Sequence, residues 1–115
     1  MEEKELVEIG KEAYVLSEQI EGLEQVMKKR EEAISGYPSH AKNFNSILDK
    51  AKKILEADPT ILKTISHLNS HDPNKEYRYT DFEGLKSDLA TLKGALKSFF
   101  VFHFPKKEKE RIGFI

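Results

Sequence analysis

Hydrophobic residues in the first third of the chain recur at alternating intervals of three and four residues. This spacing places them along one side of an α-helix, and its persistence over about four heptads is typical of a helix that packs lengthwise on another helix. Ser35 and Gly36 follow, and a glycine is suited to the left-handed conformation that commonly ends a helix. We therefore predict a long helix over about residues 3–35. Its seam consists of Leu6, Ile9, Ala13, Leu16, Ile20, Leu23, Met27, Arg30 and Ile34.

A second seam with the same spacing lies near the C-terminus. Thr80 to Glu83 form the pattern of a capping box, in which the Thr hydroxyl and the Glu carboxylate each satisfy a free backbone N–H. The pattern predicts a second long helix over about residues 81–104. Its seam consists of Phe82, Leu85, Leu89, Leu92, Leu96, Phe99 and His103.

Between the two seams, prolines divide the chain where the hydrophobic period stops or restarts. A broad apolar stripe predicts a helix over about residues 39–57. Asp58 followed by Pro59 is typical of an N-cap and a first helical position, which predicts a short helix over about residues 59–70. The residues from His71 to Thr80 have turn composition and are expected to form a loop.

These elements predict an all-α, four-helix bundle-like fold in which the two long helices pack antiparallel. Charges beside the seams agree, because Glu24 and Glu31 would then face Lys86 and Lys93 across the pair. We expect residues 1–105 to form a single helical domain. Residues 106–115 form a tail, charged and then apolar, which could dock on the domain or on a partner.

Composition limits the class of protein. The chain has 115 residues, no cysteine and a formal net charge of −1. Disulfides, thiolate nucleophiles and cysteine-based metal sites are therefore excluded, and no overall field attracts nucleic acid or an anionic membrane. The N-terminal residues are acidic and amphipathic, unlike a signal peptide, and no apolar run approaches the roughly 20 residues of a membrane span. We expect a soluble, cytoplasmic protein that makes no use of a membrane.

Two features favour a homodimer. A helix over residues 3–35 would be about 50 Å long, well beyond the about 26 Å expected for a compact domain of this size, so part of it would project or be covered by a second chain. The second long helix also ends in a block that is apolar on all sides, which requires cover from more than one neighbour. Either the monomer buries this block or it forms a surface for a second copy or another protein. The candidate interface residues are Phe99, Phe100, Phe102, Phe104, Ile112 and Phe114.

The opposite side of the second long helix carries small residues at the same spacing. It is either a solvated face or a place where another helix approaches closely, and two glycines inside a helix cost about 1 kcal/mol each relative to alanine. The stripe consists of Gly84, Ser87, Thr91, Gly94 and Ser98.

Candidate metal ligands are sparse. His67 and His71 are four residues apart, a spacing that can ligate a metal, with Asp72 and Glu76 as further candidates. The ordinary interpretation is two polar residues near a helix end. Three carboxylates three residues apart could hold magnesium, but they face away from the seam, as a solvated charged face does. These are Glu18, Glu21 and Glu24.

Other chemistry is weakly indicated. Tyr77, Arg78 and Tyr79 alternate aromatic and basic side chains, and Lys50, Lys52 and Lys53 cluster, which suggests RNA contact, but the balanced net charge argues against a nucleic-acid partner. The sequence shows no phosphate-binding loop, nucleophile motif or acid–base constellation, so we expect no cofactor and favour a protein that is not an enzyme. Arg30 and His103, both in the seams, are expected to specify register.

The sequence therefore favours a helical protein–protein interaction, scaffold or regulatory protein that acts as a homo-oligomer. The alternative is a small helical metal- or ligand-binding protein or enzyme that uses His67 and His71 or the Glu18, Glu21 and Glu24 run.

Overall fold

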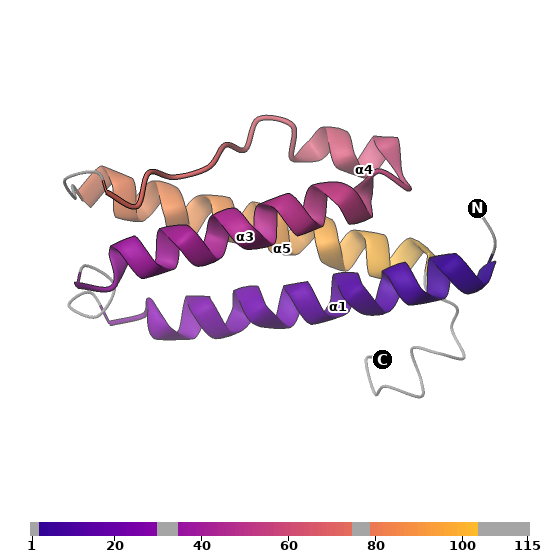
Figure 1. The fold of residues 1–115 in the computed structure, drawn as a ribbon, viewed down its shortest axis with the longest axis horizontal. Coiled ribbons are helices and arrows are strands. Elements are labelled where there is room, and N and C mark those ends of the chain that lie inside the picture. Colours follow the sequence, from indigo (N-terminus) through magenta and orange to yellow (C-terminus); the bar gives the residue numbers. More distant parts are fainter. Residues whose placement is uncertain (1–2, 30–34, 75–78, 104–115) are drawn as a thin grey trace.

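The computed structural model describes residues 3–29, 35–74 and 79–103, and it confirms the all-α, bundle-like fold. Three long helices lie side by side, α1 (Glu3–Val26), α3 (Tyr37–Leu55) and α5 (Tyr79–His103), with the short α4 (Pro59–Thr64) at one end (Figure 1). α1 runs antiparallel to both α3 and α5. The molecule is flat, with extents of 45 × 27 × 16 Å, so it has one pair of broad faces.

The two predicted seams face each other in the core. The described seam residues of α1 from Ala13 onward are buried, and so are those of α5 from Phe82 to Phe99. α3 adds a third row that includes Phe44, Leu48 and Leu55. Each fully buried side chain of this kind contributes about 1.5–3 kcal/mol relative to its exposed state, so the seams supply most of the stability.

Charge pairing beside the seams is confirmed for one predicted pair. Lys93 Nζ lies 2.5 Å from Glu24 Oε1, and both side chains are about three-quarters buried. Lys86 instead lies over the ring of Phe82, 5.3 Å from its centroid. Glu31 lies outside the described residues. The Glu24–Lys93 pair therefore agrees with the antiparallel orientation that the sequence predicted.

The first helix is shorter than predicted. It ends at Val26 instead of near residue 35. After Val26 the Met27 N–H still donates to the Leu23 carbonyl, four residues back, but the Lys28 N–H donates to the Gln25 carbonyl, only three residues back. Lys28 and Lys29 come directly after the helix end, where the partial negative charge of the last carbonyl groups favours cations. A helix of 24 residues is about 36 Å long and fits within the 45 Å length of the molecule. The prediction that the first helix is too long to be covered by its own chain is therefore wrong.

Three other helix boundaries differ from the predicted ones. Two caps were assigned to the wrong residue, and in the third case packing overrides the hydrophobic period of the sequence. Gly36 has φ of −92°, outside the left-handed region, and it precedes α3. Thr80 lies inside α5, which begins at Tyr79. α4 ends at Thr64, not near residue 70, and i→i−3 backbone bonds follow it. These turns keep Ile65 and Leu68 buried while the chain reverses direction.

The segment after α4 returns along the bundle and is fastened at His71 (Figure 1). The Asn45 side-chain amide donates to the His71 carbonyl and accepts from its N–H, both at 2.8 Å. The His71 ring donates from Nε2 to Asp88 Oδ2 at 2.7 Å and packs edge-on against Phe44. These contacts attach the returning segment to α3 and α5 together.

The small-residue stripe of α5 is explained in part by this segment. A Cβ on Gly84 would lie 4.0 Å from His71 Cε1, so at this position the neighbour of α5 is the returning chain. A Cβ on Gly94 would meet no atom within 4 Å. Another helix does not approach closely at either glycine.

Candidate functional site

Four large hydrophobic side chains are exposed in the described part of the chain, and they fall on two surfaces. Val15 and Val26, about half exposed, lie on α1 beside α3. Val101 and Phe102 lie at the C-terminal end of α5, where Phe102 is 74% exposed. We call the first surface the α1–α3 groove and the second, formed by Val101 and Phe102, the α5 tip. These two surfaces are the candidate sites for a partner.

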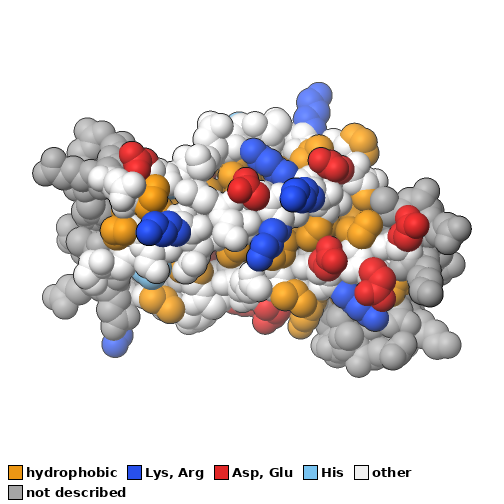
Figure 2. Space-filling model, viewed as in Figure 1, with side chains coloured by type: hydrophobic (Ala, Val, Ile, Leu, Met, Phe, Trp, Pro, Cys, Tyr) orange, Lys and Arg blue, Asp and Glu red, His pale blue; other side chains and the backbone are white. Residues whose placement is uncertain are grey.

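The α1–α3 groove consists of two adjoining hollows that share Gln19 and Lys50. The hollow beside the first half of α1 has a volume of about 560 Å³ and a floor formed by Ile9, Leu16 and Ile54. The hollow beside the second half has a volume of about 510 Å³. Figure 2 shows hydrophobic side chains along the middle of this broad face, with basic and acidic side chains mixed over α3 and mostly acidic ones over the N-terminal part of α1.

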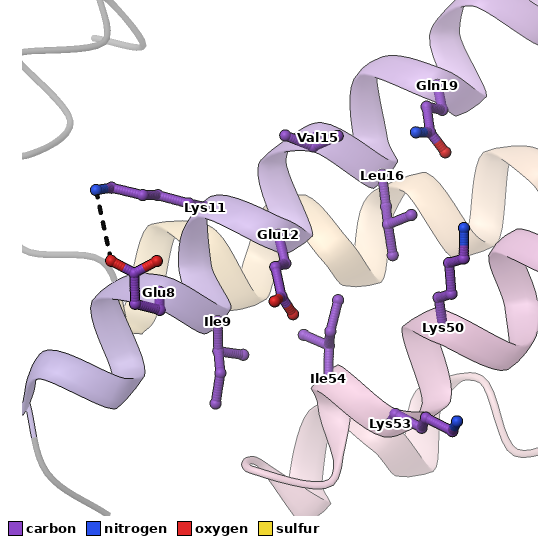
Figure 3. A pocket seen from close by; sticks show the side chains of 10 residues that line it. All are labelled: Glu8, Ile9, Lys11, Glu12, Val15, Leu16, Gln19, Lys50, Lys53 and Ile54. Carbon is purple, nitrogen blue, oxygen red and sulfur yellow. Dashed lines mark ion pairs between the residues drawn. The ribbon is translucent and has the colours of Figure 1, made fainter.

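The two edges of the first hollow carry opposite charges. Glu8 and Glu12 stand on the α1 edge, and Lys50 and Lys53 stand on the α3 edge. Figure 3 shows Glu12 pointing toward α3 and Lys50 pointing toward α1, whereas Lys11 points away and forms an exposed 3.8 Å ion pair with Glu8. No described residue forms an ion pair with Glu12, Lys50 or Lys53. The edges therefore have charge available for a partner.

Each edge is a heptad-spaced row that the sequence analysis missed. All of its members are exposed, and the α1 row is offset by one residue from the buried seam. The signal was present in the sequence, but the row on α3 is polar and resembles a solvated face until the fold places it beside α1. The α1 row consists of Glu8, Glu12, Val15, Gln19, Gly22 and Val26. The α3 row consists of Ser39, Asn43, Ser46, Lys50 and Lys53.

His40 lies in the wall of the second hollow. Its side chain is buried, and its Nε2 atom has no hydrogen-bond partner among the described residues. Buried polar atoms in proteins are nearly always paired, so this nitrogen marks the groove as a place where polar groups are incompletely satisfied.

The predicted aromatic interface is divided by the structure. Phe99 is buried in the core, and Phe100 is buried with its ring centroid 5.3 Å from that of Tyr14. These two side chains are covered within the chain and offer no surface to a partner. Phe102 is exposed, as an interface residue of the monomer must be. The remaining candidates, Phe104, Ile112 and Phe114, lie outside the described residues.

His103, which was expected to specify register, ties the end of α5 to the start of α4. Its Nε2 donates to Asp58 Oδ2 at 2.5 Å, while Asp58 Oδ1 accepts from the N–H groups of Thr60 and Ile61 at 3.1 and 3.2 Å. The hydrogen bond from His103, followed by that from the Ile61 N–H, lowers the pKa of Asp58 below its usual value of 3.8. The other register candidate, Arg30, lies outside the described residues.

The candidate metal ligands are not brought together. His71 Nε2 is bonded to Asp88, and His67 is exposed in the turn after α4. Glu24 pairs with Lys93, whereas Glu18 is exposed on α1. No group of three or more His, Asp or Glu side chains within residues 3–29, 35–74 and 79–103 is arranged to hold a metal ion. The metal- or ligand-binding alternative stays a hypothesis without support from these contacts.

The structure describes only some of the candidate nucleic-acid residues. Tyr77 and Arg78 lie outside the described residues, as does Glu76, and Tyr79 begins α5. Lys50 and Lys53 line the α1–α3 groove, where they stand opposite carboxylates. Such a mixed surface lacks the continuous basic track that a nucleic-acid backbone requires.

Comparison with known proteins gives no match to this sequence: no family model, no curated protein and no solved structure was found to correspond to it. Among the described helices, none combines the length and apolar character needed to cross a membrane. The functional interpretation therefore depends on the surfaces described above.

Proposed function

We propose that this protein acts through helix-mediated protein–protein interaction, as a small scaffold or regulatory protein that functions as a homo-oligomer. The single observation that carries the proposal is the α5 tip, where the adjacent residues Val101 and Phe102 are both exposed. Scattered exposed apolar residues need no explanation, but grouped ones commonly mark contact sites.

The α5 tip supports the proposal by its position. Phe102 and Val101 project from the last turn of a helix whose other face is fully packed, so the tip is held rigidly in place. A large aromatic side chain on a rigid support is typical of the residues that dominate binding at protein interfaces. Covering Phe102 with a partner would contribute on the order of 1.5–3 kcal/mol.

Sedimentation equilibrium from micromolar to millimolar concentration tests the proposal. The wild-type chain is expected to self-associate, and because the α5 tip and the α1–α3 groove are separate surfaces, Phe102→Glu should weaken only the contact that buries Phe102, where a carboxylate would lack a partner. Ala90→Glu, which places the same charge at an exposed position of α5, is the matched control and should behave as the wild type. A wild-type chain that stays monomeric over the whole range would rule out the homo-oligomer.

A further inference from the structure

We infer that the α1–α3 groove is the surface on which a second copy of this chain docks, in a twofold arrangement whose axis runs parallel to the groove. The inference rests on the proposed homo-oligomer and adds which face pairs and how it is oriented. It is carried by the charges of the two groove edges and by the heptad spacing of the two exposed rows.

The charge pattern is self-complementary for one orientation. Figure 3 shows Glu12 across the groove from Lys53, with Glu8 farther toward the N-terminus of α1 and Lys50 farther toward the start of α3, beside Gln19. A twofold axis parallel to the groove places α1 of one copy over α3 of the other without changing the level of any residue along the bundle. Glu12 of each copy then comes near Lys53 of its partner, twice. A twofold axis perpendicular to the groove would stack α1 on α1 and α3 on α3, which leaves the charges unmatched.

Helix geometry favours the same orientation. α1 and α3 are antiparallel within the chain, so α1 of one copy would also run antiparallel to α3 of the other. The four helices then have antiparallel neighbours on every side, as in up-and-down bundles. The rows that would meet, on α1 and on α3, both repeat at intervals of four and three residues, which is the spacing that helices need to pack lengthwise.

The second hollow is shaped for close approach. Gly22 on α1 would lie near the level of Ser39, Asn43 and Ser46 of the other copy's α3, so short side chains would meet there. A Cβ added at Gly22 meets no atom of the described residues within 4 Å, so no described contact explains a glycine at this position inside α1. Val15 and Val26 would be covered in the same contact. Because the rows are mostly polar, the interface has the character of a reversible dimer.

Two charge-reversed variants test the orientation. The basic variant, Glu8→Lys with Glu12→Lys, makes both groove edges basic, and the acidic variant, Lys50→Glu with Lys53→Glu, makes both acidic. Each variant alone should dimerise more weakly than the wild type, on the order of tenfold or more, because like charges then face each other at both edges. Mixed in equal amounts they should form a heterodimer with an affinity near that of the wild type, detected by native mass spectrometry and sedimentation.

Matched controls separate this effect from a change in net charge. Glu18→Lys on α1 with Glu83→Lys on α5, and Lys42→Glu with Lys52→Glu on α3, alter the charge equally at exposed positions outside the groove, and both should leave dimerisation unchanged. Gly22→Gln should also weaken the dimer while the monomer folds at least as well, because the new side chain enters open space in the monomer and favours the helix.

The outcomes are distinguishable. Wild-type dimers with groove variants that dimerise equally well, or a mixture of the two variants that stays monomeric, would overturn the docking arrangement and leave the homo-oligomer intact. A wild-type chain that is monomeric at millimolar concentration would overturn both proposals.

Discussion

Asp58 joins two helices with the two oxygens of one carboxylate. Oδ1 caps α4 and Oδ2 accepts from His103 of α5, so the residue fixes where α4 begins and holds α4 to α5. The sequence identified Asp58 as the N-cap from the proline that follows it, and this prediction is confirmed. It could not identify the partner, because His103 is 45 positions away and comes close only when the bundle forms.

The lowered pKa of Asp58 predicts a loss of stability in acid. A carboxyl group whose pKa is lower in the folded than in the unfolded chain stabilises the fold fully above its ordinary pKa of 3.8 and loses that contribution as the pH falls through the folded value. Asp58→Asn keeps an oxygen that can cap α4 but has no charge. The difference in free energy of unfolding between the wild type and this variant should therefore shrink from neutral pH to below 3.8, measured by urea denaturation.

His103→Gln is the control for the cause of that shift. With the His103 donor removed, the pKa of Asp58 should move back toward its usual value, so the acid-induced loss of stability should be smaller than in the wild type. A wild-type to Asp58→Asn difference that stays constant from neutral to acidic pH would contradict the assignment.

At the scale of single helices, the period of hydrophobic residues was the informative signal. It predicted four described helices, the antiparallel pairing of α1 with α5 and the Glu24–Lys93 contact, because periodicity, caps and flanking charges are local properties. Helix ends were less accurate. The seam spacing continues to Ile34, yet α1 ends at Val26, since a sequence period does not show where the chain must turn to bury α3.

At the aromatic end of α5, the sequence likewise could not predict which side chains are buried. Phe99, Phe100 and Phe102 are equivalent in hydrophobicity, and only the position of α1 and its neighbours decides which are covered. The α1–α3 groove was missed for a related reason, because its rows become one surface only after the two helices are placed side by side.

Two phenylalanines on α5 make this division measurable. Phe99 is fully buried and packs on the His103 ring with centroids 4.6 Å apart, whereas Phe102 is 74% exposed. Phe99→Ala should lower the free energy of unfolding by about 3–5 kcal/mol, and Phe102→Ala by no more than about 0.5 kcal/mol. Urea denaturation at a concentration where the chain is monomeric compares the two. Equal losses would mean that the rotation of α5 about its axis is wrong.

At the scale of the whole molecule, the bundle of α1, α3 and α5 should be more stable against local opening than α4, which packs at one end of it. α1, α3 and α5 share one continuous core, and a residue such as Leu89 is buried in it completely. α4 has six residues, so it has few internal hydrogen bonds and depends on the Asp58 cap and on Ile61. Proteins open locally where such contacts are few, so α4 is expected to open without the bundle unfolding.

Native-state hydrogen exchange can separate these two openings. Leu89→Ala removes core contacts in the middle of α5 and should lower the exchange free energies of the central amides of α1, α3 and α5 together, by about 2–5 kcal/mol. The amides of α4 should exchange faster than those amides in the wild type and should be unchanged by Leu89→Ala, because their exchange proceeds through local opening. Ile61→Ala, the matched substitution in α4, should accelerate α4 alone. If Leu89→Ala lowered protection in α4 by the same amount as in the long helices, α4 would belong to the same cooperative unit as the bundle.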